Sequence, residues 1–229
     1  MNTVPKKISA SLAEFCKTIS IERPRYIPSK PNRSALLSAC FQNVHQKVEA
    51  YGGQLCCGWL IWAIPNLYYE AEFHGVWRND KGHFLDVNPQ MNKVKKIMFL
   101  PDFSAVYDAD NCQTNRFEVA KNNAPSLKFV ELARERNSII NRYRRGEYLD
   151  QNYGTADSRR LDEISTELQN IITDHGHYLG CNQIIPIFFP ARSNLPKISP
   201  TCSTVCSAHS EQRNNVIPAG VAGGLAKFT

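Results

Sequence analysis

Residues 67–89, LYYEAEFHGVWRNDKGHFLDVNP, predict a β-hairpin, and the expected fold is built around it. Its first part, 67–77, alternates in side-chain type, as expected for a strand with two different faces. The composition of residues 79–82, Asn-Asp-Lys-Gly, is typical of a turn. A short strand over 83–87 follows, and Pro89 closes it. One face of the first strand carries Tyr69, Ala71, Phe73, Gly75 and Trp77, and the other carries Tyr68, Glu70, Glu72, His74 and Val76.

The length of the turn decides what His74 meets. With an odd loop, either Asn79–Lys81 or Arg78–Gly82, His74 lies directly opposite Asp86, and an even loop turns Asp86 to the other face. Directly opposed residues have Cβ atoms about 4.5–5.5 Å apart, within reach of an imidazole–carboxylate hydrogen bond. Two plainer arrangements stay open: an ordinary cross-strand ion pair, or a contact of His74 with Glu70 or Glu72. Asp86 is then the candidate partner of His74.

The segment SACFQNVHQKVEAYGG, residues 38–53, predicts an amphipathic helix that ends at Gly52-Gly53. Ser38 as N-cap places Cys40 in the first turn, where free amide groups and the helix dipole favour a thiolate. Ser34 as N-cap would place Cys40 one turn deeper. As a plainer alternative, Cys40 is a small apolar core residue. The apolar face of this helix carries Leu37, Phe41, Val44, Val48 and Tyr51.

Cys40, His74 and Asp86 have the residue types of a thiol-activating triad. The cysteine attacks, the histidine takes its proton, and the carboxylate fixes the histidine tautomer. The pattern resembles the transglutaminase-like branch of the papain-like cysteine hydrolase superfamily, over roughly Pro31–Pro101. The resemblance implies an α+β fold: a small antiparallel sheet packed on a helix with the cysteine at its N-terminal end, plus additional C-terminal helices. It also implies a hydrolase or acyltransferase, namely an amidase, deamidase, thiol protease or transglutaminase, acting on a protein or peptide without a cofactor or metal.

The chain departs from these relatives at two motifs. Many of them carry H-x-W and D-P-T, whereas here the sequences are HGVW (74–77) and DVNP (86–89). Papain-like relatives also place a glutamine before the cysteine to bind the oxyanion, and none precedes Cys40. The backbone N–H of Cys40 would then serve, assisted by a side chain. The candidates for oxyanion or substrate contact are Asn32, Asn43 and Trp77, with Tyr26 as a further donor.

Composition favours a globular protein without choosing its chemistry. The 229 residues, 42% of them hydrophobic, suit one domain of ordinary core size with extra segments. We expect an N-terminal extension over 1–30, a catalytic domain over 31–190 and a disordered tail over 191–229. Neither a signal-peptide pattern nor a run of about eighteen apolar residues occurs, so we expect a cytoplasmic protein without membrane contact.

Eight cysteines and a net charge of +6 raise three further hypotheses. Without a signal peptide the cysteines are expected to stay reduced, with Cys56 or Cys57 as alternative nucleophile. The basic residues are spread along the chain, which favours solvated faces or an acidic partner over nucleic acid. The competing function is therefore a non-catalytic module that binds an acidic protein. A zinc site matches the residue types but not the spacing of known modules; its candidates are His175, His177, Cys181, Cys202, Cys206 and His209.

The remaining segments are predicted from periodicity and composition alone. The stretch ERPRYIPSKP, 22–31, is expected to be irregular because of its prolines. Residues 110–123 are expected to form a polar loop. A strand is expected over 93–100, and helices over 9–19, 126–145 and 157–173.

Overall fold

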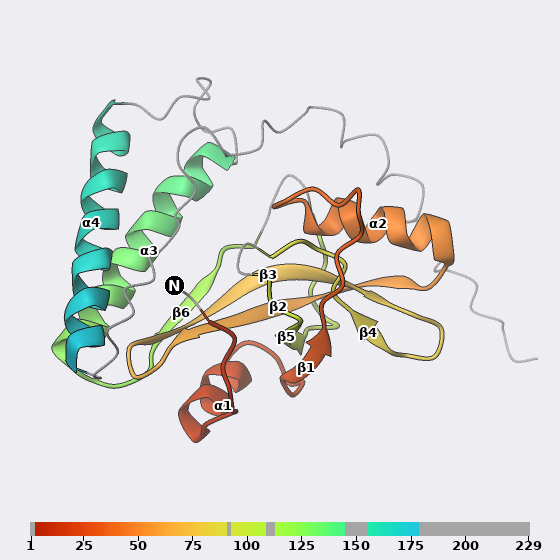
Figure 1. Ribbon diagram of the computed structural model, residues 1–229, viewed down its shortest axis with the longest axis horizontal. Coiled ribbons are helices and arrows are strands. Elements are labelled where there is room, and N and C mark those ends of the chain that lie inside the picture. Colours follow the sequence, from red (N-terminus) through yellow and green to blue (C-terminus); the bar gives the residue numbers. More distant parts are fainter. Residues whose placement is uncertain (1–2, 91–92, 109–112, 145–154, 179–229) are drawn as a thin grey trace, which may run out of the picture. The chain divides into compact units, whose positions relative to one another are not determined.

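The computed structural model describes residues 3–90, 93–108, 113–144 and 155–178. Within these ranges it combines helices with one antiparallel sheet (Figure 1), in agreement with the expected α+β class. The helices are α1 (Ala10–Lys17), α2 (Cys40–Tyr51), α3 (Ala124–Arg144) and α4 (Thr155–Tyr178). The strands are β1 (Arg25–Pro28), β2 (Gln54–Ile64), β3 (Tyr68–Arg78), β4 (Phe84–Leu85), β5 (Lys96–Pro101) and β6 (Arg116–Val119). Their order is β1-β5-β2-β3-β4, and β6 also pairs with β3.

The centre of the sheet is the long hairpin of β2 and β3. Its ladder runs without interruption from Gln54 opposite Arg78 to Ile64 opposite Tyr68. Asn66 adopts a φ of 60° in the turn between them, a conformation that asparagine tolerates better than most residues. Side chains on both faces of the hairpin are buried, so it forms the middle layer of the core. The expected alternation over 67–77 is therefore confirmed as a strand.

Helices α1 and α2 pack on the face of β3 that carries Tyr69 and Phe73. Phe15 of α1 stacks on Tyr69 with ring centroids 6.2 Å apart, and Phe41 of α2 lies 5.3 Å from Phe73. The hydroxyl of Ser9 accepts a hydrogen bond from the first turn of α1, which fixes where that helix begins. The expected helix over 9–19 is confirmed, with bounds two residues shorter at its C-terminal end.

The expected N-terminal extension contributes one strand to the sheet. Residues 25–28 form β1, which pairs with β5 from Arg25 opposite Phe99 to Pro28 opposite Lys96. The expectation that prolines keep 22–31 irregular is wrong for these four residues. Pro28 is tolerated because β1 stands at the end of the strand order, where one side of the strand makes no ladder.

The loop between β3 and β4 has an odd number of residues, which is the case that keeps His74 and Asp86 on one face. Its bounds differ from both expected odd loops. Trp77 lies opposite Leu85 and Arg78 opposite Phe84, so the loop is 79–83. Asn79 sets this loop, because its backbone N–H donates to His83 O and its side chain accepts from His83 N. The expected direct opposition of His74 and Asp86 is therefore wrong by two residues, and the contact between them is diagonal. The odd parity still keeps both side chains on one side.

The sheet nearly closes on itself at Asp86. Ser29, which follows β1, forms a parallel bridge with Asp86, which follows β4. The N–H of Asp86 donates to Pro28 O at 3.0 Å, and the N–H of Lys30 donates to Asp86 O at 2.8 Å. The first and last strands of the order thus meet at this carboxylate.

Helices α3 and α4 and strand β6 form a second apolar cluster at the turn end of the hairpin. Residues 116–119 pair with β3, so the expected polar loop over 110–123 is wrong at these positions. The helices expected over 126–145 and 157–173 are confirmed as α3 and α4, with longer bounds. The buried members of the cluster include Tyr68, Phe117, Phe129, Leu132, Ile164 and Leu168.

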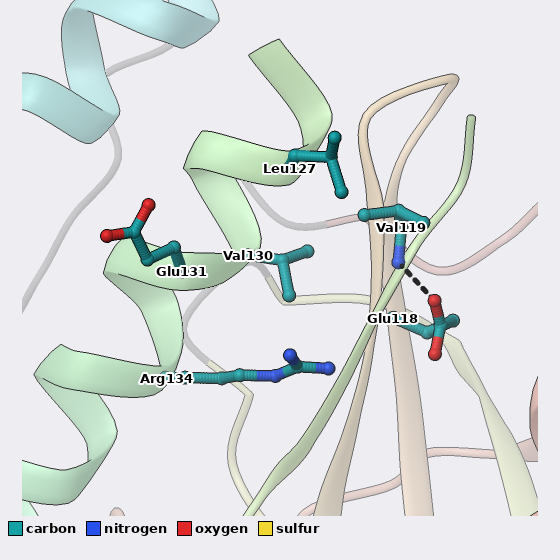
Figure 2. Close-up of a pocket in the computed structure, with 6 residues that line it drawn as sticks. All are labelled: Glu118, Val119, Leu127, Val130, Glu131 and Arg134. Carbon is teal, nitrogen blue, oxygen red and sulfur yellow. Dashed lines mark hydrogen bonds between the residues drawn. The ribbon is translucent and has the colours of Figure 1, made fainter. Parts of the chain in front are cut away.

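A cavity of about 300 Å³ lies between β6 and α3 (Figure 2). Arg134 donates to Phe117 O at 2.7 Å, and Val119 N donates to Glu118 Oε1 at 3.0 Å. These bonds occupy backbone groups along β6. None of the three triad candidates lines this cavity.

Two of the expected domain bounds cannot be compared with the structure. The tail over 191–229 and the end of the expected 31–190 domain lie outside the described residues. Among the helices that are described, none combines the length and apolar character needed to cross a membrane.

Gly75 permits the close approach of α2 to β3. A methyl group there would lie 2.9 Å from Phe41 Cδ1 and 2.9 Å from Leu55 Cδ1. We expect Gly75→Ala to lower the free energy of unfolding by about 1–3 kcal/mol through overpacking, as measured by urea denaturation. In a double-mutant cycle with Phe41→Ala the two losses should be less than additive, because Cδ1 and Cε1 of Phe41, which the methyl meets, are then absent. Strictly additive losses would contradict the contact.

Candidate active site

Cys40 is the first residue of α2, and its thiol is half-buried. The N-cap is Ala39, which provides no side-chain cap, so the expectation of a serine cap at Ser38 or Ser34 is wrong. Ser38 instead has a φ of 60°. The first-turn position expected for Cys40 is confirmed. A helix start without a side-chain cap leaves its first amides to an anion such as a thiolate or an oxyanion.

His74 and Asp86 form a buried pair. His74 Nε2 lies 3.1 Å from Asp86 Oδ1, and the residues are 4% and 0% exposed. Oδ1 also accepts from the backbone N–H and the side-chain amide of Asn88, at 3.1 and 2.8 Å. Oδ2 accepts from Ser29 Oγ at 2.9 Å and from Gln90 Nε2 at 3.0 Å. Five donors thus surround the two oxygens of this carboxylate.

These contacts decide the charge of Asp86. Burial raises the pKa of the Asp86 carboxyl, but the hydrogen bond and charge of His74 and the bonds from Gln90 and Asn88 outweigh it. The resulting pKa lies below the usual value for aspartate, so Asp86 is ionised at neutral pH. An ionised carboxylate at this position holds a proton on Nε2 of His74.

His74 also interacts with Cys40. Burial lowers the pKa of His74, while the charge of Cys40 and side-chain hydrogen bonds with Asp86 and Cys40 raise it well above its usual value. Because Nε2 faces Asp86, Nδ1 is the ring nitrogen left to face the thiol. The structure therefore brings all three triad candidates together.

Glu70 and Glu72, the alternative partners of His74, make other contacts. Tyr68 Oη donates to Glu70 at 3.2 Å, and Asn115 Nδ2 donates to it at 2.8 Å. Trp62 Nε1 donates to Glu72 at 2.8 Å. The ring of His74 bonds instead to Asp86 through Nε2, and the amide nitrogen of Asn88 lies beside it at 3.2 Å.

Asn43 and Trp77 are already committed to other atoms. Asn43 is 1% exposed, and its amide donates to Leu36 O at 2.8 Å and to Asn88 Oδ1 at 3.1 Å. Trp77 Nε1 donates to Gly52 O at 2.8 Å. The expectation that either side chain supplies a free oxyanion donor is therefore corrected: both hold the surrounding chain.

The other two candidate donors, Tyr26 and Asn32, make their described hydrogen bonds to backbone oxygens. Tyr26 Oη donates to Pro5 O at 2.7 Å. Asn32 is half-buried, and its backbone N–H donates to Val87 O at 3.2 Å. The first-turn amides of α2 are consequently the best-placed donors next to Cys40.

The remaining described cysteines are poor nucleophiles. Cys56 and Cys57 lie on opposite faces of β2, as expected for neighbours in a strand. Burial raises the pKa of both thiols to about 11, and it raises the pKa of Cys16 to about 12. The alternative assignment of Cys56 or Cys57 as nucleophile is therefore disfavoured.

Three residues around Asp86 were missed by sequence reasoning: Ser29, Asn88 and Gln90. Ser29 lies in a segment expected to be irregular, and it meets Asp86 across 57 positions of the chain. Asn88 and Gln90 follow Asp86 at spacings of two and four. The local signal was Asn88 in the motif DVNP, since asparagine commonly bonds back to a neighbouring residue.

The structure describes only part of the zinc hypothesis. His175 Nε2 lies 2.9 Å from Pro65 O. The side chain of His177 and residues Cys181, Cys202, Cys206 and His209 fall outside the described part. Within that part, no group of three or more histidine, cysteine or acidic side chains is arranged to hold a metal.

Comparison with known proteins gives no further assignment. A scan against family models and searches of curated proteins and of solved structures found no match to this chain.

The thiols should differ in reactivity. At about pH 7.5, limiting iodoacetamide should modify Cys40 before Cys16, Cys56 and Cys57, since the other three are held as neutral thiols by burial. Peptide mapping by mass spectrometry measures the order. Equal labelling of Cys40 and Cys57 would argue against an activated thiol.

Glu70 should make stability depend on pH. Burial and the charge of Glu72 raise the pKa of Glu70 from 4.5 to about 7, so folding disfavours its ionised form. This penalty is absent below pH 4.5, grows as the pH rises to about 7 and is constant above it. Glu70→Gln removes the penalty, so its stability relative to the parent protein should rise over that interval in urea denaturation. A difference that does not change with pH would contradict the raised pKa.

Proposed function

We propose that this protein is a cysteine-dependent acyl-transfer enzyme that acts on a carboxamide or peptide bond through Cys40, His74 and Asp86. The observation that carries the proposal is the placement of His74. Its ring bonds to a buried, ionised carboxylate on one side and to a thiol at a helix N-terminus on the other. That arrangement supplies a nucleophile, a base and an orienting group in one unit.

The reaction would begin from a thiolate–imidazolium pair, in which the proton of Cys40 Sγ already resides on Nδ1 of His74. The thiolate attacks the substrate carbonyl, and an S–C bond forms while the carbonyl oxygen becomes an oxyanion. The amide groups at the start of α2, which lack a side-chain cap, lie next to the thiol and can donate to this oxygen. The C–N bond then breaks as His74 returns the proton to the leaving amine, which leaves a thioester on Cys40.

The second half of the reaction exchanges the thioester. Water loses a proton to His74 and attacks the thioester, which releases a carboxylic acid and restores the thiol. An amine in place of water gives a new amide, so the same groups serve a hydrolase, thiol protease or transglutaminase. Asp86 keeps its charge throughout and stabilises the imidazolium.

The transglutaminase-like branch of the papain-like superfamily is the family we propose. Support comes from the order of a cysteine opening a helix, a histidine in the next hairpin and an aspartate after the following strand. The chain has HGVW in place of H-x-W. In place of D-P-T it has Asp86-Val87-Asn88, with Asn88 at the position of the threonine. The proposed substrate is a protein or peptide, and the net charge of +6 would suit an acidic one. The proposed location is the cytoplasm.

An activated ester tests the proposal without knowledge of the natural substrate. p-Nitrophenyl acetate should acetylate Cys40, with release of p-nitrophenolate in a burst, and intact-protein mass spectrometry should show one added acetyl group. Asp86→Asn should slow acylation by about 10³–10⁴-fold, because the wrong histidine tautomer is favoured and the charge that stabilises imidazolium is lost. His74→Ala should be at least as damaging. Glu72→Gln, on the same strand but bonded to Trp62, is the matched control and should be nearly neutral.

The outcomes separate the two candidate classes of function. Loss of the burst in Cys40→Ser, together with the expected order of the other variants, supports catalysis. A folded protein whose acetylation is unaffected by Cys40→Ser or Asp86→Asn would support the non-catalytic binding module. Chasing the acetylated protein with water or with methylamine then distinguishes hydrolysis from amine transfer.

A further inference from the structure

The side chains of Asn43 and Asn88 connect the helix that carries Cys40 to the strand that carries His74. Asn43 is in α2, one turn after Cys40, and donates from Nδ2 to Asn88 Oδ1 at 3.1 Å. Asn88 in turn donates to Gly75 O at 3.0 Å and to Asp86 Oδ1 at 2.8 Å. These two amides, called here the Asn43–Asn88 bridge, join three separate segments of the chain.

Both members of the bridge are buried and fully used. Asn43 is 1% exposed and Asn88 is 3% exposed. Asn43 Oδ1 accepts from Leu36 N at 2.9 Å, and its amide donates to Leu36 O, so the entry to α2 is held by the same side chain. Burying two amides costs free energy unless all their groups are bonded, and bonding them so completely fixes their positions.

The bridge also reaches the reacting histidine. Asn88 Nδ2 lies 3.2 Å from His74 Nε2, the ring atom that faces Asp86. Because Asn88 holds the backbone oxygen next to His74 and the carboxylate that orients it, a shift of Asn88 would move both. Asn43 is in the same helix as Cys40, so its bond to Asn88 fixes the position of Cys40 relative to His74 and Asp86.

We propose that Asn43 and Asn88 are positioning residues of the active site, whose bridge sets the separation between the Cys40 thiol and the His74 ring. The inference rests on the proposed function. Without the bridge, α2 is held against β3 by apolar contacts such as Phe41 with Phe73, which tolerate small displacements. Hydrogen bonds are directional and short-ranged, so they define the relative position of helix and strand more closely than those contacts.

The test is the pH dependence of Cys40 alkylation by iodoacetamide, followed by peptide mapping. A thiolate stabilised by His74 stays reactive at about pH 6, whereas an ordinary thiol loses reactivity there by about tenfold for each unit below its pKa. We expect Asn88→Ala to lower the Cys40 rate at about pH 6 by roughly tenfold, yet to leave the rate at about pH 9.5 within about twofold. Asn43→Ala should act in the same direction. The double variant should lose no more than Asn88→Ala alone, because both changes break one bridge.

Two controls separate positioning from general damage. Asn141→Ala removes an asparagine of similar burial in α3, whose described side-chain hydrogen bond is to Asn137, and should change neither rate. Ser29→Ala removes one donor from Asp86 but leaves the bridge intact, so its effect at about pH 6 should be smaller than that of Asn88→Ala. Near-ultraviolet circular dichroism confirms folding. If Asn88→Ala fails to fold, Asn43→Ala tests the bridge from its other end.

The failures of the two proposals differ. If the parent protein already shows the pH dependence of an ordinary thiol at Cys40, the proposed function fails and the bridge has no catalytic site to position. The other case is a parent protein whose Cys40 is alkylated rapidly at about pH 6. If the folded variants Asn88→Ala and Asn43→Ala then show the same rate as the parent protein, only the positioning role is overturned. Lower thermal stability with an unchanged ratio of the two rates would assign the bridge a structural role alone.

Discussion

The buried carboxylate of Asp86 constrains the rest of the structure, because a charge without solvent contact must be compensated by the protein. Five hydrogen bonds from the described residues do so, given by Ser29, His74, Gln90 and twice by Asn88. An ionised carboxylate in the interior with too few hydrogen bonds would lower the free energy of unfolding by on the order of several kcal/mol. The segments that supply these donors must therefore meet at one point. The near closure of the sheet, from the end of β1 to the end of β4, is the backbone arrangement that lets them meet.

The same carboxylate links architecture to chemistry. It fixes the proton on Nε2 of His74, which leaves Nδ1 for the thiol of Cys40. Helix α2 brings that thiol into place by two kinds of contact. Phe41 packs closely over Gly75, and the Asn43–Asn88 bridge ties the helix to the residues around His74. Stability and the proposed reactivity consequently depend on an overlapping set of bonds, so substitutions near Asp86 are expected to affect both.

Sequence reasoning failed where short strands and turns depend on distant partners. Strand β1 contains a proline and β6 lies in a polar stretch, so neither shows the periodicity of a half-buried strand. Each gains its hydrogen bonds from a neighbour far along the chain, β5 or β3. The observed register of β3 and β4 differs by two residues from the expected one, because the side chain of Asn79 closes a five-residue loop. The oxyanion assignment to Asn43 failed for a related reason, since its amide is used by Leu36 and Asn88.

Local periodicity predicted the long alternating strand β3 and the helices α1, α2 and α4. The apolar face expected for α2 is buried at Phe41 and Val44, whereas Leu37 and Tyr51 are 44% and 69% exposed. The first-turn position of Cys40 was one of two alternatives that the sequence left open. His74 and Asp86 were expected on one side of the hairpin only for an odd loop, because an odd loop preserves side-chain parity whatever its exact position, and the observed loop is odd. Two features emerge from tertiary contacts alone: Ser29, 57 residues before Asp86, donates to its carboxylate, and Asn88 joins that carboxylate to α2. Alternation and helical spacing are properties of neighbouring residues, whereas the compensation of a buried charge depends on which segments meet in space.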